Sequence, residues 1–224
     1  MERIETMGKA PILVDSMFIG ASKTITDDRG TWQSSIYRDR VQGSQTLEVR
    51  GFVGDKNHQP YHGAPDAAIC CHLLSHYRFW NEQYGMNLEA GFAGENLVLE
   101  NVEESDLCLA DTYSLGTAVV QVSGCRTPCA NLARRIGRTD WVELTLKELR
   151  LGFYLRVIQP GVVAPGDPLI LTERPYPHIT LPDFNRCYFF DLDPILAKEL
   201  IEMPESNEYF KVRLRAKLED LISG

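Results

Sequence analysis

Short hydrophobic segments recur along the first three quarters of the chain, and glycine- or proline-rich turns separate them. Many short strands at near-regular spacing, with few long helices, are typical of a closed or nearly closed β-barrel. The sequence therefore predicts a mostly β fold with a few short helices, over residues 76–84, 128–136 and 144–151. The predicted strands cover residues 11–20, 32–41, 47–53, 67–74, the end of 91–99, 107–115, 118–122, 153–158 and 169–171.

The character of the sequence changes near residue 174. Residues 174–182 contain prolines that restrict the backbone, so we expect an extended linker there. Asp193 and Pro194 then predict a helix start. We expect a barrel domain over residues 1–174 and a small helical module over residues 175–224. Helical spacing in this module is carried by Phe210, Leu214, Leu218 and Leu221.

Cys129 lies where a predicted strand runs directly into a predicted short helix. Thr127 can serve as the N-cap and Pro128 as the first helical residue, and Gly137 would end the helix. The helix dipole and the neighbouring Arg126 would then favour the thiolate, which is a nucleophile and a metal ligand. A buried, inert thiol is the alternative, because free cysteines are among the most buried residues. The local sequence leaves these two interpretations about even.

Composition excludes several classes of protein. With 224 residues, 44% hydrophobic and 24% charged, the chain resembles an ordinary soluble globular protein. A formal net charge of −8 argues against a general binder of nucleic acid or of anionic membranes. No segment resembles a membrane span or a signal peptide, so we expect a cytoplasmic protein whose six cysteines are reduced. No C-x-x-C pair and no flavin, haem or iron–sulfur motif occurs.

Three loops, at residues 62–66, 94–97 and 126–129, place polar residues beside glycine or proline at strand ends, where backbone N–H groups can face a ligand. These loops belong to seven motifs, in order Gly51–Asp55, His62–Asp66, Gly91–Leu97, Ala110–Asp111, Val122–Cys129, Phe153–Val157 and Pro165–Asp167. Together they make the chain similar to the MOSC domain family, named for the C-terminal domain of molybdenum cofactor sulfurases, and to its stand-alone bacterial YiiM-like group. One such motif is weak, but seven in order are specific. The resemblance covers residues 10–175.

The resemblance implies a MOSC-type β-barrel that binds the molybdenum–pterin cofactor, with Cys129 as a ligand of the metal. Dithiolene sulfurs hold this metal, and a thiolate is a suitable further soft ligand. The family includes reductases of N-hydroxylated bases and amidoximes, so the resemblance implies a small-molecule substrate. Because the chain has no second redox motif, electrons would come from a separate reductase. Pyridoxal phosphate binding is a weaker implication of the family.

The resemblance also gives candidate roles to basic residues, each with a structural alternative. Arg126 would hold cofactor oxygens or support the thiolate, or else form a surface ion pair. Arg156 would point toward the cofactor phosphate, or else form a salt bridge at the barrel rim. His62 would bind phosphate or donate a proton near neutral pH, or else stabilise its loop.

Acidic and amide residues of the loops complete the candidate set. Asp66 and Glu95 offer acceptor oxygens that suit the N–H groups of a pterin, and Asn96 can donate or accept. Gly63 and Gly94 belong to the same cofactor-binding loops. The alternative for these polar side chains is the capping of turns, a common use of such residues.

The chain departs from the family pattern at several positions. A second glycine is common at Ala64, and lysines are common at Arg38, Ala67 and Asn131. Two positive charges are thus missing from the expected anion site, so cofactor affinity or substrate choice would differ. Separately, we expect Arg134, Arg135 and Arg138 to form a solvated helix face.

Two other functions are consistent with the sequence. In the first, the chain is a non-catalytic carrier of sulfur or cofactor, and Cys129 forms a persulfide. In the second, the helical tail binds a partner protein, and deletion of residues 176–224 would abolish function while the barrel stays folded. We also consider a homodimer.

Overall fold

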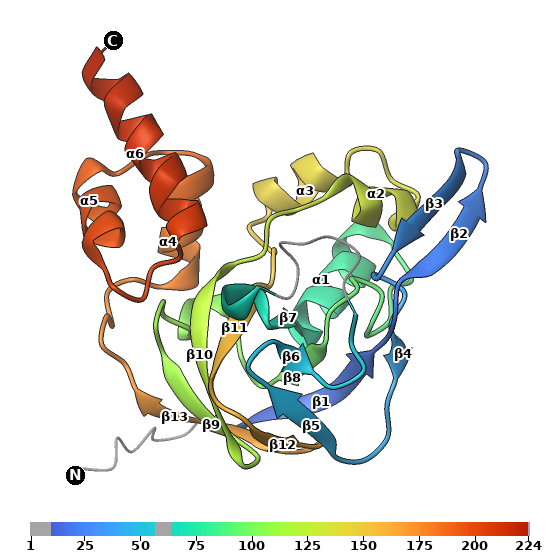
Figure 1. The fold of residues 1–224 in the computed structure, drawn as a ribbon. Coiled ribbons are helices and arrows are strands. Elements are labelled where there is room, and N and C mark those ends of the chain that lie inside the picture. The colour runs from blue at the N-terminus through green and yellow to red at the C-terminus, as the bar shows by residue number, and fades with distance from the viewer. Residues whose placement is uncertain (1–9, 57–63, 224) are drawn as a thin grey trace.

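The computed structural model describes residues 10–56 and 64–223 (Figure 1). The barrel strands are β1 (Ile12–Ile19), β7 (Ile69–Leu73), β8 (Leu97–Glu100), β9 (Thr112–Leu115), β10 (Ala118–Cys125), β11 (Phe153–Gln159) and β13 (Pro168–Glu173). Their neighbour order is β13, β9, β10, β11, β7, β8 and β1. The sheet closes because β13 also pairs with β1, which confirms the predicted barrel.

One pair in the barrel is parallel, whereas the others are antiparallel. Strands β7 and β8 pair in parallel, with Cys71 opposite Leu97. A parallel pair needs a crossover connection, and helix α1 (Leu74–Tyr84) lies in the segment that supplies it. Helix α1 ends at Gly85, as expected of a glycine in the left-handed conformation.

Strand β7 shows why the candidate site lies outside the barrel. Ile69, Cys71 and Leu73 belong to the main hydrophobic cluster, which fills the barrel. Alternate residues of a strand point to opposite faces of the sheet, so Cys70 and His72 face outward. Both outward residues are nonetheless buried, because further structure covers this face.

Helices provide that cover. A second hydrophobic cluster joins Phe18 of β1 and Val98 of β8 to α1, α2 (Ala130–Ile136) and α3 (Trp141–Lys147). Trp80 and Trp141 pack with ring centroids 4.9 Å apart. The helices therefore form a layer over one outer side of the barrel.

Two predicted strands are interrupted in the structure. Residues 47–53 form parts of β5 (Gln45–Glu48) and β6 (Gly51–Phe52), which pair as a hairpin with Glu48 opposite Gly51. Residues 32–41 divide between β3 (Gly30–Ser34) and β4 (Asp39–Arg40), with Arg38 bent inward between them. Two further strands were not predicted from the sequence: β2 (Lys23–Asp27), which pairs with β3, and β12 (Gly161–Val163), which pairs with β5.

The C-terminal helices are α4 (Leu181–Phe189), α5 (Pro194–Glu202) and α6 (Glu208–Ser223). Strand β13 ends at Glu173, and α4 follows after Thr180, whose hydroxyl accepts a hydrogen bond from the Asp183 N–H. The last two residues of the expected linker, 181 and 182, are therefore helical. Asp193 caps α5 as predicted, accepting hydrogen bonds from the backbone of the first turn.

These helices pack directly on the barrel. Phe184, Leu200 and Leu214 belong to the same buried cluster as the barrel interior. The ring of Phe210 lies against Gly124 of β10 so closely that a Cβ added there would be 2.3 Å from it. The distal end of α6 extends away from this contact (Figure 1).

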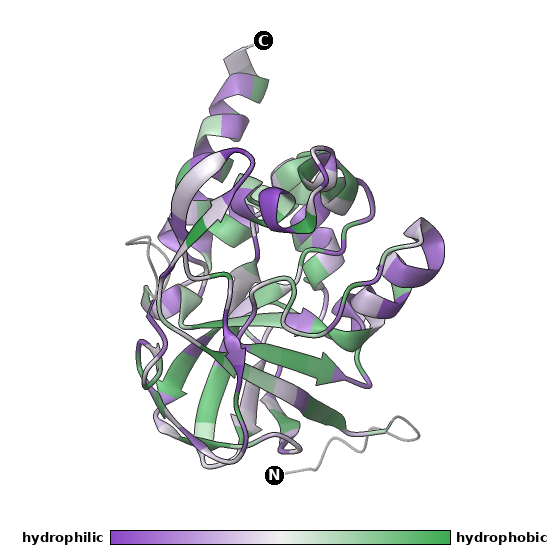
Figure 2. Cartoon of the chain, turned by 90° about the vertical axis from the view of Figure 1, so that its right-hand side faces the viewer, coloured by the Kyte–Doolittle hydropathy of each residue, from purple (hydrophilic) through white to green (hydrophobic). Residues whose placement is uncertain are grey.

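The distribution of hydropathy agrees with this packing. Figure 2 shows hydrophobic colour along the barrel strands and a mixture of hydrophilic and hydrophobic residues along α6. Within residues 10–56 and 64–223, no helix has the length and hydropathy needed to cross a bilayer.

Candidate functional site

Cys129 lies at the start of α2 rather than inside its first turn. Helix α2 begins at Ala130, and Cys129 is its N-cap residue with an extended backbone. The predicted N-cap at Thr127 and first helical residue at Pro128 are therefore wrong. The reason is that Arg126 is still bonded to the sheet, because its N–H donates to the Gly152 carbonyl oxygen over 3.0 Å.

Cys129 is nevertheless the accessible cysteine of the chain. Its side chain is partly exposed and packs beside the second hydrophobic cluster. The remaining thiols are all buried, and burial raises the pKa of each of them. They are Cys70, Cys71, Cys108, Cys125 and Cys187.

Arg126 places a buried positive charge close to this thiol. Only 7% of the residue is exposed, and its Nη2 donates to the Ala93 carbonyl oxygen over 2.6 Å. Its Nη1 is buried and has no hydrogen-bond partner among the described residues. Burial lowers the pKa of Arg126, but the nearby Cys70, Tyr154 and Cys129 outweigh that effect and raise it. Arg126 is therefore charged, with a free donor to offer.

Glu95 contributes a buried acceptor on the same loop. The carboxylate Oε1 accepts hydrogen bonds from the Tyr77 hydroxyl over 2.5 Å and from the Gly91 N–H over 2.7 Å. Its Oε2 is buried and has no partner among the described residues. The Tyr77 hydroxyl also accepts from the Ala93 N–H, so the loop that holds Glu95 also holds Arg126.

Two buried polar atoms, one donor and one acceptor, thus lack partners around this loop. Leaving such a group unpaired costs about 1–3 kcal/mol, so a ligand that pairs with it is favoured. The donor on Arg126 suits an anionic or carbonyl oxygen, and the acceptor on Glu95 suits an N–H group.

The neighbouring Asn96 and Gly94 have structural contacts. Asn96 Oδ1 accepts from the Cys70 N–H over 3.0 Å, and its Nδ2 donates to Phe18 and Asp55. Gly94 has a φ of +73°, and an added Cβ would lie 2.8 Å from Ile36. Cofactor binding by either residue stays a prediction.

Arg156 forms the salt bridge that was the alternative to phosphate binding. Its Nε lies 2.9 Å from Asp66 Oδ1, and its Nη2 donates to the Glu205 carbonyl oxygen over 2.7 Å. Asp66 and Arg156 are therefore brought together and joined to the loop between α5 and α6. His62 and Gly63 lie outside the described residues.

The guanidinium group of Arg38 is bound by groups of the protein itself. Its Nε and Nη2 bind the carboxylate of Asp55 over 2.8 and 2.9 Å, and its Nη1 donates to the Gly94 carbonyl oxygen over 2.6 Å. Arginine can make this forked contact, whereas the lysine expected from the family pattern cannot.

Two residues of the site, Cys70 and Tyr154, were not predicted from the sequence. Cys70 and Tyr154 are directly opposite on the antiparallel strands β7 and β11, so their side chains are neighbours on the outer face. Both contribute to the electrostatic environment of Arg126. The placement of Tyr154 and Arg156 on one face of the predicted strand 153–158 was the available signal, but it does not reveal which strands pair.

The expectation of a solvated face is wrong for two of the three arginines, Arg134 and Arg135 of α2, whereas Arg138 follows the end of that helix. Arg134 forms an ion pair with Asp27 and lies 4.7 Å from the centre of the Trp32 ring. Arg135 lies over Tyr37 and donates to the Ile36 carbonyl oxygen. The contacts of Arg134 attach the β2–β3 hairpin, which the prediction lacked, to α2, and those of Arg135 attach the segment that follows β3. The third arginine, Arg138, pairs with Asp140 at the surface.

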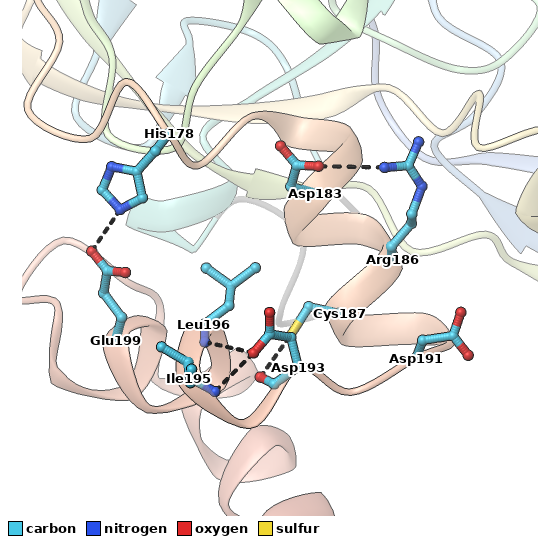
Figure 3. A pocket seen from close by; sticks show the side chains of 9 residues that line it. All are labelled: His178, Asp183, Arg186, Cys187, Asp191, Asp193, Ile195, Leu196 and Glu199. Carbon is cyan, nitrogen blue, oxygen red and sulfur yellow. Dashed lines mark hydrogen bonds and ion pairs between the residues drawn. The ribbon is translucent and has the colours of Figure 1, made fainter.

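A hollow of about 440 Å³ lies elsewhere, between α4 and α5 (Figure 3). Several of its polar groups already have partners within the protein. His178 lies 2.9 Å from Glu199, and Asp193 accepts hydrogen bonds from the first turn of α5. No three His, Cys, Asp or Glu side chains among the described residues are placed to bind a metal ion.

Comparison with known proteins gives consistent matches. The family model described as "MOSC domain" matches residues 58–170. The uncharacterized protein YflK of Bacillus subtilis (strain 168) is 33% identical over 187 residues, which are 83% of this chain and 85% of YflK. A protein named "Reductase" from Gibberella moniliformis is 32% identical over 152 residues, 66% of this chain but 27% of its own length.

A solved structure agrees in fold. The crystal structure of YiiM from Geobacillus stearothermophilus has a TM-score of 0.76 and 31% sequence identity to this chain. The match covers 91% of this chain and 100% of that structure.

Proposed function

Because the chain belongs to the MOSC domain family, we propose that it binds the molybdenum–pterin cofactor and reduces N-hydroxylated small molecules such as bases and amidoximes. One observation carries the proposal. A buried, charged Arg126 with an unpaired Nη1 lies near the accessible thiol of Cys129. An anionic cofactor with a metal that accepts soft ligands fits both groups.

Each residue has a stated part in this proposal. Cys129 would supply a thiolate to the metal, and Arg126 would pair with an anionic oxygen of the cofactor. Glu95 accepts an N–H of the pterin through its unpaired Oε2. Contacts with Ala93 and Gly152 hold Arg126 in place before the ligand arrives, which lowers the cost of ordering it on binding.

The proposed reaction determines how many electrons and protons must be delivered to the site. Conversion of an N–OH group to N–H and water consumes two electrons and two protons. When bound, the cofactor supplies the two-electron chemistry, and the protein supplies binding, orientation and electrostatics. We propose that a separate reductase provides the electrons, because the sequence has no flavin, haem or iron–sulfur motif. The match to a fungal protein named "Reductase" supports redox chemistry.

Metal analysis of the Cys129→Ser variant tests the proposal. Protein made in a host that synthesises the cofactor should contain about one molybdenum per chain, and the variant should lose most of it while keeping its circular dichroism spectrum. Cys187→Ala is the matched control, because Cys187 is buried in the helical module and should not affect the metal. Molybdenum retained by Cys129→Ser would remove this residue from the metal site.

A second function follows from the same accessible thiol. A carrier of sulfur would hold a persulfide on Cys129, which is the one partly exposed cysteine among the six. Intact mass measurement would then detect one extra sulfur atom that a reducing agent removes, in protein that contains no molybdenum and has no N–O reductase activity.

A further inference from the structure

We propose that Glu104 is a positioning residue that links the support of Arg126 to helix α4. Glu104 lies in the short 3₁₀ helix η2 (Glu104–Asp106) and is 5% exposed. Its Oε1 accepts a hydrogen bond from the Gly152 N–H over 2.7 Å. The carbonyl oxygen of Gly152 in turn accepts from the Arg126 N–H over 3.0 Å. Glu104 therefore reaches Arg126 through a single intervening residue.

Gly152 has little freedom to move between these partners. A Cβ added to it would lie 2.5 Å from the Cys71 carbonyl oxygen and 2.8 Å from His72 Nδ1. Such close approach means that the position of Gly152 is fixed by strand β7 on one side and by Glu104 on the other. Loss of the Glu104 contact therefore removes one of the two supports of the residue that accepts the Arg126 hydrogen bond.

The second oxygen of Glu104 faces the helical module. Asn185 of α4 is 0% exposed, and its Nδ2 donates to Glu104 Oε2 over 3.4 Å. The Oδ1 of the same amide is buried and has no partner among the described residues. The amide oxygen therefore lacks a donor, and Glu104 is the side chain that the amide already contacts.

Glu104 can be that donor when it carries a proton. Burial raises its pKa to about 8, although the Gly152 and Leu151 N–H groups and Arg150 act in the opposite direction. A neutral carboxyl has an O–H, which can bond to Asn185 Oδ1 once the amide turns over. The buried carboxyl then carries no charge at neutral pH, and its contact with Asn185 holds α4 to the barrel.

The other titratable groups around Glu104 favour this state. His76 of α1 places its Nε2 3.7 Å from Oε1, and burial, then His72 and Arg150, hold the pKa of His76 well below its usual value. Glu103 raises the pKa of Glu104, and the charge of Glu104 would act on Cys125 of β10. His76 is therefore neutral, and the proton resides on Glu104.

The direction of the pH effect follows. In the undocked or unfolded chain Glu104 loses its proton near its ordinary pKa of 4.5, whereas in the docked state it does so near 8. The docked state is therefore favoured by low pH and weakens as pH rises toward 8. Burial keeps His72 and His76 neutral in the docked state, and comparison with Glu104→Gln isolates the contribution of Glu104 in this interval.

Hydrogen exchange of α4 tests the link to the module. In the wild-type protein, the protection of residues 181–189, corrected for intrinsic rates, should fall by up to about tenfold per pH unit between pH 6.5 and 8, and then level off. Glu104→Gln keeps the shape and a donor for Asn185 but cannot ionise, so it should show no such fall. Glu82→Gln, on the exposed side of α1, is the matched control and should behave as the wild type.

Selective alkylation of Cys129 tests the link to Arg126. Both iodoacetate and iodoacetamide react with the same thiolate, but a correctly placed Arg126 attracts the anionic iodoacetate. The ratio of the two rates should fall in Glu104→Ala and be restored in Glu104→Gln. If Glu104→Ala does not fold, the exchange experiment alone decides between the outcomes.

Two results would overturn the proposal: an α4 protection profile in Glu104→Gln that still follows the wild type, or an unchanged rate ratio in folded Glu104→Ala. The inference rests on the proposed function only in treating Arg126 as a site residue. Neither measurement requires molybdenum, so the failure of one proposal is distinguishable from the failure of the other.

Discussion

At the scale of single residues, Arg126 combines a buried positive charge with a free donor close to the accessible cysteine. Arg126→Met should lower the ratio of iodoacetate to iodoacetamide rates at Cys129. A unit charge within several ångströms in water changes the energy of an approaching anion by about 0.5–1 kcal/mol, so the ratio should fall about two- to fivefold at low salt. Mass spectrometry of the alkylated cysteine gives both rates.

Arg138→Met is the control for this measurement, because Arg138 is paired with Asp140 at the surface. It should leave the ratio unchanged. An Arg126→Met protein with the wild-type ratio would show that the charge does not act on this thiol.

Gly94 and Gly137 provide a second comparison of single residues. Their φ angles are +73° and +75°, but a Cβ on Gly94 would lie 2.8 Å from Ile36 whereas one on Gly137 meets nothing within 4 Å. Gly137→Ala should lower the free energy of unfolding by about 1 kcal/mol, the cost of a left-handed alanine. Gly94→Ala adds a steric clash and should cost about 3 kcal/mol. Urea unfolding measures both, and equal losses would mean that Ile36 moves away freely.

At the scale of elements, α2 supports the β2–β3 hairpin as well as presenting Cys129. Arg134 binds Asp27 and lies over Trp32, and the pKa of Asp27 falls to about 2, first because of its hydrogen bonds to Arg134. Arg134→Ala should therefore increase hydrogen exchange and proteolysis within residues 23–34, while the barrel strands stay protected.

Acid should affect the same contact in the wild-type protein. The lowered pKa of Asp27 means that its contribution is present above pH 4 and is lost as pH falls through about 2. Arg138→Ala serves as the control and should leave the hairpin protected. Unchanged exchange in Arg134→Ala would mean that the hairpin is held by other contacts.

At the scale of the whole molecule, buried titratable groups should give stability a maximum near pH 6.5. Burial lowers the pKa of His72 to about 3, so the unfolded chain binds a proton first as pH falls below 6.5 and stability decreases toward pH 3. Burial raises the pKa of Glu104 to about 8, so stability decreases as pH rises from 4.5 to 8. His76 is also buried and neutral, so it destabilises the fold in acid in the same way as His72. Below pH 6.5 the loss of stability from the two histidines therefore exceeds the gain from Glu104.

Thermal unfolding between pH 4 and pH 9 checks this profile. Glu104→Gln should flatten the alkaline side, and His72→Gln should reduce the slope of the acid side. Parallel profiles for these variants and the wild type would contradict the assignment of the two sides to these groups.

Several features followed from the sequence because they depend on local physics. Short hydrophobic runs such as residues 67–74 and 118–122 predicted strands, and glycine and proline between them predicted turns. The closed barrel could therefore be predicted from the sequence. Asp193 before Pro194 predicted the start of α5, because capping depends on adjacent residues. The motif around Arg126 and Cys129 identified the region of the candidate site.

Only the tertiary structure determined which residues from distant segments contact one another. Helix α2 starts at Ala130 and not at the predicted Pro128, because Arg126 is hydrogen-bonded to Gly152, a residue 26 positions later in the chain. Cys70 lies opposite Tyr154 because strands β7 and β11 pair, and Glu104 is hydrogen-bonded to Asn185 because α4 packs against η2. Both contacts join segments that are distant in sequence. Local patterns determine the conformation of a segment and the face that it buries. They do not determine what lies against that face, because this depends on how the whole chain closes around its core.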